Sequence, residues 1–386
     1  MTVIGDAAWR KRERARKLKE GIWQAGLLFT VALLIGYFVL NVSTNLQARS
    51  IHSGFDFLLE RAGIEIGETL IDFSSTDTFF KAFVVGLLNT IKVSVISIIS
   101  ATVIGVLIGL MRLSSHPLLR MLGTAHVEFY RNIPLLVQLL LIYMLITELL
   151  PMSTEALQFG QWALLSKAGL QVSIPIHNGV AILSGLAVFV VSFLLFKVRF
   201  QKKYTDLVSN ILSGIISFLF SFFTWILFGI FSGWSHPEIQ GFAIEGGTSL
   251  SPEFLSLWIG LTLFTSASIA EIVRAGVLAV PQRQWSASYA LGMSSLETIS
   301  YVIFPQALRL AIPPLSSQYM NLTKNSSLAV IVGYPDLVSI GNSTINLNGQ
   351  ALEVIVITMV VYLFLNLVIS VLMNLLNARV TRGTRQ

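Results

Sequence analysis

Long, charge-poor apolar segments recur along almost the whole chain, and they constrain its fold more than any other feature. A helix needs about 20 mostly apolar residues to cross a bilayer. Eight such segments are present, at residues 22–42, 83–111, 132–150, 179–197, 207–231, 254–273, 313–333 and 353–377. Only 12% of the residues are charged, whereas soluble domains carry about 25%. The sequence therefore predicts an all-α, polytopic membrane protein with eight transmembrane helices.

The positions of Lys and Arg predict the orientation of these helices, because basic residues concentrate in cytoplasmic loops. With the N-terminus in the cytoplasm, 20 of the 26 basic residues lie in cytoplasmic segments. The exceptions lie in outer segments or within spans: Arg49, Arg61, Lys81, Lys167, Lys92 and Lys324. We therefore expect both termini in the cytoplasm. The basic run at 9–20 is interpreted as an anchor to anionic lipids and not as part of a cleavable signal peptide.

Several functions are disfavoured by what the sequence lacks. There is no cysteine, and no two of the five histidines lie three or four residues apart, so no metal site is expected. The net charge of +6 is explained by the basic residues that orient the spans, so no nucleic-acid partner is expected. No Gly-Lys dipeptide occurs, which excludes a GxxxxGK[ST] phosphate-binding loop. We expect neither enzymatic activity nor a cofactor, and ATP hydrolysis would lie on a separate subunit.

Polar side chains within the spans are candidates for a transport pathway, because charge is costly in a bilayer. Lys324 is the clearest, lying midway along the span at 313–333 beside Asn321 and Asn325. Such a lysine can face a pore and meet a substrate carboxylate, or it can be buried and bonded to backbone carbonyls. The first interpretation is favoured. Gln138, in the third span, is a further candidate for the pathway.

Two other charged positions within spans have mainly structural interpretations. Lys92 lies in the outer third of its span and is expected to extend toward lipid phosphates. Glu271 and Arg274 are three residues apart near the inner end of the sixth span, which predicts an intrahelical ion pair. Glu271 is also retained as a candidate pathway residue, because it is the only carboxylate placed deep within a predicted span.

The longest segment assigned to the cytoplasm, residues 274–312, is not strongly basic. Gly292 is expected to end one short helix, and Pro305 to begin a new turn. Trp285 and Tyr289 are four residues apart, so they share one face of the first helix. Two short helices across a glycine turn would form a docking surface. Aromatic residues placed at the membrane interface explain the same spacing equally well.

The same segment resembles the EAA loop of ATP-binding-cassette (ABC) importer permeases. The matching residues are Ser286-Ala287-Ser288, Gly292 and Val302-Ile303-Phe304-Pro305. Further segments are similar to the polar amino-acid (HisMQ-like) branch of these permeases, at 86–95, 131–144, 267–282 and 313–333. Residues 45–71 resemble the first of the two permease subunits in general L-amino-acid and glutamate/glutamine/aspartate/asparagine importers (Aap and Bzt types).

This resemblance implies the five-helix, MetI-like core of an ABC type I importer permease. The core would occupy residues 83–377, with a helical hairpin inserted at about 151–253. Residues 1–82 would add the basic cytoplasmic N-terminus, the first transmembrane helix and an acidic periplasmic segment. Residues 378–386 would form a cytoplasmic tail.

The implied function is ATP-driven import of polar or general L-amino acids across a bacterial inner membrane. The implied partners are an ABC ATPase subunit, a second permease subunit, a periplasmic amino-acid-binding protein and membrane lipids. The loop that docks on the ATPase would comprise Trp285, Ser286, Ala287, Ser288, Tyr289, Gly292 and Pro305. The family's usual glutamate is Ser286 here, so docking would depend more on shape than on charge. An ion-coupled secondary amino-acid transporter is the alternative, and it would require carboxylates within the spans.

Overall fold

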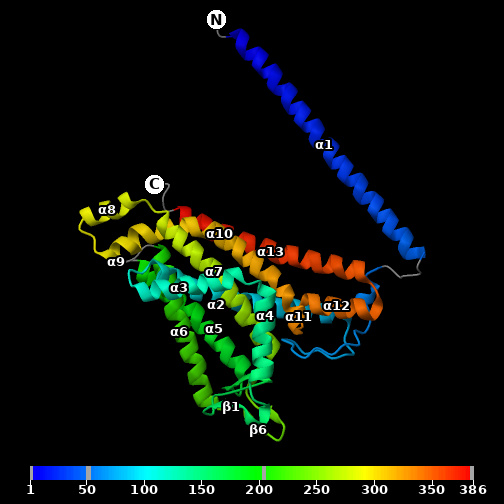
Figure 1. Ribbon diagram of the computed structural model, residues 1–386, viewed down its shortest axis with the longest axis vertical. Coiled ribbons are helices and arrows are strands. Elements are labelled where there is room, and N and C mark those ends of the chain that lie inside the picture. Colours follow the sequence, from blue (N-terminus) through cyan, green and yellow to red (C-terminus); the bar gives the residue numbers. More distant parts are fainter. Residues whose placement is uncertain (1–2, 49–53, 202–205, 383–386) are drawn as a thin grey trace.

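The computed structural model describes residues 3–48, 54–201 and 206–382 (Figure 1). Within these ranges six helices are long and apolar enough to cross a membrane, and two bent helix pairs also qualify. Counting each bent pair as one span brings the total to eight, as expected from the sequence. Lipid offers no hydrogen-bonding partner. A chain this apolar therefore forms its backbone hydrogen bonds within helices.

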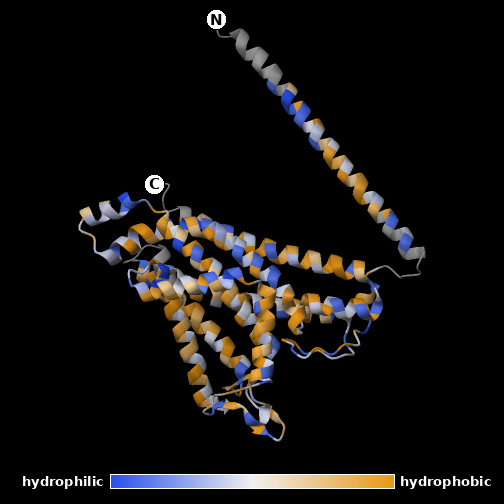
Figure 2. Cartoon of the chain, in the orientation of Figure 1, coloured by the Kyte–Doolittle hydropathy of each residue, from blue (hydrophilic) through white to orange (hydrophobic). Residues whose placement is uncertain are grey.

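Each of the six single helices contains one of the expected spans. They are α1 (Val3–Ala48), α2 (Phe79–Leu113), α5 (Asn178–Gln201), α6 (Asp206–Ser232), α7 (Pro252–Leu278) and α13 (Ala351–Arg382). Helix α1 extends away from the other helices (Figure 1), and none of its best apolar window is buried. Hydrophobic residues also run along α5, α6 and α13 (Figure 2), as expected of surfaces that face lipid.

Helices α2 and α7 pack closely along each other, and glycine allows the approach. A Cβ added at Gly105 would lie 2.7 Å from the Cβ of Ile269, and one at Gly109 would lie 2.9 Å from the carbonyl oxygen of Ala270. Small residues permit close contact between helices in membranes, where no hydrophobic force draws them together. Helix α10 (Phe304–Asn325) packs against both α7 and α13, which completes this central group.

The two remaining spans are bent, which the sequence did not predict. Helix α3 (Pro117–Asn132) meets α4 (Leu135–Met144) and its π-helical extension η2 (Leu145–Leu149) at 103°. Pro134 stands at this bend as the N-cap of α4, and proline cannot donate a backbone hydrogen bond. The expected span at 132–150 is therefore only the second arm of a bent pair.

The second bent pair includes a helix that was not expected from the sequence. The stretch from Thr298 to Val332 contains α10, η5 (Ser326–Leu328) and α11 (Ala329–Val332), and it meets α12 (Leu337–Asn348) at 49°. Gly333 adopts φ +82°, which ends α11. The Asp336 carboxylate then accepts a 2.8 Å hydrogen bond from the Ser339 amide and caps α12.

The segment between α4 and α7 forms a helical hairpin with small sheets at one end. Helices α5 and α6 pack against each other. Strands β1 (Leu157–Phe159), β2 (Ala163–Ser166), β3 (Gly169–Val172) and β8 (Thr248–Leu250) form one antiparallel sheet in that order. Two further pairs join β4 (Ile174–Pro175) to β5 (Trp234–Ser235), and β6 (Glu238–Gln240) to β7 (Ala243–Glu245).

These sheets add short strands, which the sequence did not predict, to the expected helical fold. The strands are two to four residues long, too short for alternation of polar and apolar residues to identify them. The main sheet also pairs β3 with β8, which lies 76 residues or more further along the chain. Such pairing depends on the α5–α6 hairpin returning to its starting point. The helical character of the rest of the fold stands.

Residues 54–78, here called the strap, lead into α2. One short 3-10 helix, η1 (Asp56–Leu59), is the only helix in this part of the described chain. Phe57 and Ala62 are buried against Phe79, Leu337 and Val354, so the strap packs on the end of the molecule where α2 begins. This end, which also holds the start of α7 and α12, is called the strap end.

Alanine at Gly105 tests the close approach of α2 and α7. Its Cβ would meet Ile269 at 2.7 Å, so the helices must separate, and we expect the free energy of unfolding to fall by about 1–3 kcal/mol. Thermal unfolding of the detergent-purified protein measures this. Gly214→Ala on α6 is the matched control, because nothing lies within 4 Å of its added Cβ. Equal losses in both variants would contradict the close contact.

Candidate functional site

The loop between α7 and α10 contains two short helices, α8 (Gln282–Ala290) and α9 (Ser295–Glu297). Gly292 adopts φ +77°. Its amide donates to the Tyr289 carbonyl at 3.0 Å, and the Met293 amide donates to the Ser288 carbonyl at 3.2 Å. This is the Schellman motif, which satisfies the last carbonyls of a helix. The predicted helix end at Gly292 is confirmed.

Helix α9 begins at a capping box and leads into a π-helical turn. The Ser294 hydroxyl accepts from the Glu297 amide, and the Glu297 carboxylate accepts from the Ser294 amide at 2.8 Å. This backbone hydrogen bond lowers the pKa of Glu297, so the cap holds at neutral pH and weakens as the pH falls toward that pKa. The turn η4 (Thr298–Ile303) follows, and Pro305 lies in the first turn of α10.

Trp285 and Tyr289, although four residues apart on α8, have different surroundings. Trp285 packs against Val280, Ile303 and Ala307, so it anchors α8 to the base of α10. Tyr289 is 50% exposed. The expected shared aromatic docking face is therefore divided between an anchor and an exposed ring.

The remaining loop residues show the same division. Ser288 is buried and its hydroxyl donates to the Gln284 carbonyl at 2.8 Å. Ser286 and Ala287 are exposed. Leu291, which was not a candidate from the sequence, is 82% exposed beside the glycine turn. The exposed surface of the loop thus contains Ser286, Ala287, Tyr289 and Leu291.

Glu271 forms the centre of a charged cluster at the same end of the molecule. Its carboxylate pairs with Arg274 at 3.2 Å, which confirms the predicted intrahelical pair. It also pairs with Arg112, in the last turn of α2. Sequence spacing could not reveal Arg112, which lies 159 positions away. The cluster joins the end of α2 to α7 just before the α8 loop.

The candidate pathway residues of α10 lie at its end, and Gln138 lies elsewhere. Asn321 and Lys324 are exposed and Asn325 is half-buried. Lys324 is in the last turn of α10, not midway along a straight span. Among the described residues no ion pair of Lys324 is present, and its side chain is exposed in this chain, so both interpretations of the lysine stay predictions. Gln138 is 3% exposed.

Gln138 stabilises the bend between α3 and α4. Its amide donates to the Tyr130 carbonyl at 2.9 Å and to the Ile133 carbonyl at 2.8 Å. These are carbonyls left without helical partners by the bend at Pro134. The side chain therefore lies inside the bend rather than on an exposed face.

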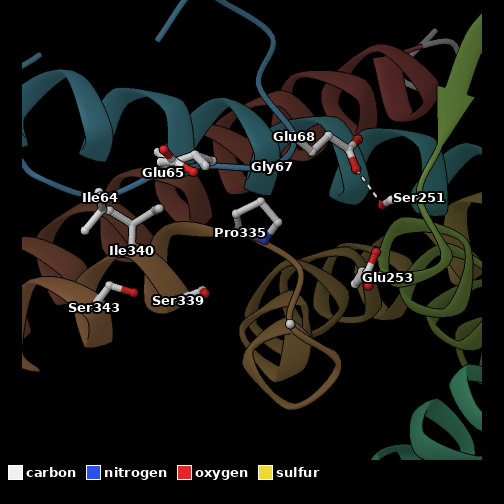
Figure 3. Close-up of a pocket in the computed structure, with 12 residues that line it drawn as sticks. Ile64, Glu65, Gly67, Glu68, Ser251, Glu253, Pro335, Ser339, Ile340 and Ser343 are labelled. Carbon is white, nitrogen blue, oxygen red and sulfur yellow. Dashed lines mark hydrogen bonds between the residues drawn. The ribbon is translucent and has the colours of Figure 1, made fainter. Parts of the chain in front are cut away.

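Lys92 was expected to extend toward lipid phosphates, and this expectation is wrong. Its ammonium pairs with Glu68 of the strap and lies 4.5 Å from the centroid of the Phe254 ring. Glu68 also borders a cavity of about 370 Å³ (Figure 3). Other lining residues are Glu65, Ser251, Glu253, Pro335 and Ser339. The acidic residues of the strap could be seen in the sequence, but how close they lie to the helix ends could not be predicted from it.

Comparison with known proteins gives the class of this arrangement. Residues 197–382, from α5 through the α8 loop to α13, match the family "Binding-protein-dependent transport system inner membrane component". The chain is thus a multi-pass membrane component of an ABC transport system, a class whose permeases work with an ATPase and a substrate-binding protein.

Three relatives match over nearly the whole chain. The putative amino-acid ABC transporter permease protein YhdX of Escherichia coli is 42% identical over 93% of both chains. The general L-amino acid transport system permease protein AapQ of Rhizobium johnstonii is 38% identical, over 91% of this chain and 90% of the relative. The glutamate/glutamine/aspartate/asparagine transport system permease protein BztB of Rhodobacter capsulatus is 36% identical over the same shares. The chain belongs to the amino-acid ABC transporter permeases, which confirms the resemblance drawn from its sequence.

Glutamine at Glu271 tests the charged cluster. The substitution leaves Arg112 and Arg274 facing each other without the carboxylate that they share, and a hydrogen bond to a charged group contributes about 1.5–3 kcal/mol. We expect a loss of that order in the free energy of unfolding, measured by denaturation of the purified protein. The exposed Glu148→Gln is the matched control. If Glu271→Gln were as stable as that control, the cluster would not join α2 to α7.

Proposed function

We propose that this chain is one of two different permease subunits of an ATP-driven amino-acid importer in a bacterial inner membrane. A separate ATPase would dock on the α8 loop, and a periplasmic binding protein would deliver the amino acid. The observation that carries the proposal is the exposed α8 helix closed by the Gly292 turn. It occupies the place of the EAA loop in a chain whose relatives are amino-acid ABC permeases.

The proposed orientation places the α8 loop and both termini in the cytoplasm. It is supported by the distribution of basic residues, which concentrate on the same side as the α8 loop. The strap end then faces the periplasm. This agrees with the acidic composition of the strap, which contains Asp56, Glu60, Glu65, Glu68, Asp72 and Asp77.

Docking on the ATPase would depend on shape, because Ser286 replaces the usual carboxylate. Ala287, Tyr289 and Leu291 offer an apolar, exposed surface, and apolar area removed from water stabilises such an interface. Trp285 would transmit movement of α8 to α10, because it packs on Ile303 and Ala307. Glu271 would connect the same movement to α2 through Arg112.

The substrate pathway is proposed to run along α10. Ser317, Asn321 and Lys324 are exposed at intervals of four and three residues, which aligns them on one face. A polar face is unfavourable against lipid, so the second permease subunit or an aqueous path would cover it. Lys324 would meet the substrate carboxylate, with Asn321 and Asn325 beside it. Gln138 would contribute by holding the α3–α4 bend.

The substrates are proposed to be polar or general L-amino acids, since two relatives are named for general L-amino acids and for glutamate, glutamine, aspartate and asparagine. Reconstitution with the ATPase, the second permease and the binding protein tests the function. Radiolabelled L-glutamine should enter proteoliposomes only when ATP and the ATPase are both present. Uptake that persists without them would favour the ion-coupled alternative.

Valine at Gly292 is expected to uncouple transport from ATP hydrolysis. At φ +77° a β-branched residue is strained, so the Schellman turn opens and α8 loses its docked geometry. The protein should still insert in the membrane, while ATP-driven uptake falls at least tenfold. Ala290→Val, in the same loop, is the control. Normal uptake by Gly292→Val would show that docking does not need this turn.

Glutamine at Lys324 is expected to lower uptake without lowering the stability of the chain. The ammonium is exposed and its loss leaves no described carboxylate unpaired, so the change acts on the pathway. We expect at least a tenfold lower rate of uptake at unchanged membrane abundance. Lys81→Gln, on a half-exposed ion pair with Asp77, serves as the control. Equal uptake by both variants would remove Lys324 from the pathway.

A further inference from the structure

A carboxylate-binding site is built at the strap end, and a carboxylate of the chain itself occupies it. The Glu68 carboxylate pairs with the Lys92 ammonium through one oxygen. Its other oxygen accepts a 2.7 Å hydrogen bond from the Ser251 hydroxyl. Ser251 is also the N-cap of α7 and accepts from the Phe254 amide at 3.1 Å. The carboxylate therefore lies at the positive end of a 27-residue helix.

The surroundings of Lys92 favour an anion beside its ammonium group. Its side chain is 19% exposed and lies against the Phe254 ring. Glu68 is its only ion-pair partner among the described residues. Removing one member of such a shielded pair is unfavourable because the other charge remains uncompensated. Glu68 is thus displaced readily only when another anion takes its place.

The segment that carries Glu68 is not locked by regular structure. From Glu60 to Thr78 the strap contains no helix, and its one bridge joins Arg61 to Thr78. Near Glu68 the main chain is tied by one further hydrogen bond, from the Asn89 amide to the Glu68 carbonyl at 2.8 Å. Besides the packing of the half-buried Ile66 on the cluster around Phe79 and Leu337, the ion pair with Lys92 and the bond to Ser251 are the side-chain contacts that hold Glu68 and this part of the strap.

A cavity opens directly beside the occupied site. Its volume of about 370 Å³ falls in the range of small-molecule pockets, about 300–1,000 Å³. Glu68 and Ser251 belong both to its wall and to the carboxylate site, and Glu253, two residues after Ser251, lines the cavity beside them (Figure 3). A ligand in the cavity would therefore find, next to the bound carboxylate, a second carboxylate suited to an ammonium group.

We propose that Lys92 and Ser251 form an entry site for the α-carboxylate of the transported amino acid, which displaces Glu68 and thereby releases the strap. The proposal rests on the proposed function, which supplies the amino acid. Exchange of one carboxylate for another keeps Lys92 paired and Ser251 bonded, so neither group is left uncompensated. The α-ammonium group then meets Glu253.

This exchange couples substrate arrival to opening of the strap end. With no amino acid present, Glu68 closes the site and joins the strap to α2 and α7. When the amino acid binds, the strap retains its packing at Phe57 and Ala62 but loses its attachment near Gly67. The release is local, and it makes the cavity accessible from the strap side.

A thiol reporter beside Glu68 tests the release. The chain has no cysteine, and Gly67 is exposed with nothing within 4 Å of an added Cβ. The Gly67→Cys chain is assembled in proteoliposomes with the ATPase, second permease and binding protein. Labelling of this chain by a membrane-impermeant maleimide is timed with and without L-glutamine. We expect labelling at least threefold faster with L-glutamine.

Two further variants, each combined with Gly67→Cys, test the mechanism. Glu68→Gln weakens the bond to Lys92, so labelling should be fast already and insensitive to L-glutamine. Glu60→Gln, exposed on the strap outside the cavity lining, is its matched control and should retain the response. Thr154→Cys, exposed on another segment of the strap end, should label equally in both conditions.

The outcomes separate this inference from the proposed function. Uptake of radiolabelled L-glutamine by the unsubstituted assembly is measured in parallel. If uptake occurs but Gly67→Cys labels at one rate in all conditions, Glu68 is a structural contact only and the entry site is overturned. A response to L-glutamine that survives in Glu68→Gln would overturn it as well. Absence of uptake by the unsubstituted assembly would instead overturn the proposed function.

Discussion

The close approach of α2 to α7 is the contact on which the rest of the structure depends. Lipid provides no hydrophobic force between helices, so their association relies on packing at short distance. Gly105 and Gly109 permit this distance where α7 presents Ile269 and Ala270. With the two helices joined, their ends form both functional regions. Lys92 and Ser251 both contact Glu68 towards one end, and Arg112 and Glu271 meet at the other.

The charged groups at these two ends share one arrangement. Each lies on a helix of the central pair and is neutralised by a group from a different segment, as a low-dielectric environment requires. Lys324 differs, because it is charged, exposed and unpaired within the described chain. This difference supports its proposed place along a path shared with another subunit, whereas the paired groups connect helices or hold the strap.

The sequence predicted those parts of the fold and site that depend on local properties. Five spans were placed within a few residues, because bilayer thickness sets the length of an apolar helix, whereas α1 extends well beyond the sixth. The turn at Gly292 was predicted because ending the helix there depends only on the left-handed backbone conformation of that one residue. The bends were missed, although Pro134 and Gly333 were visible. Their angles depend on contacts such as those of Gln138.

The sequence by itself determined that this chain spans a membrane, belongs to the amino-acid ABC permeases and carries a loop with a glycine turn. Only the tertiary structure decided which charges are paired and which side of α8 is free. Trp285 is an anchor because α10 begins beside it, and Lys92 has a partner because the strap reaches it. The physical reason is the separation in sequence over which each kind of interaction acts. Hydropathy and turn geometry act over neighbouring residues, whereas ion pairs and packing join segments whose separation in sequence carries no signal.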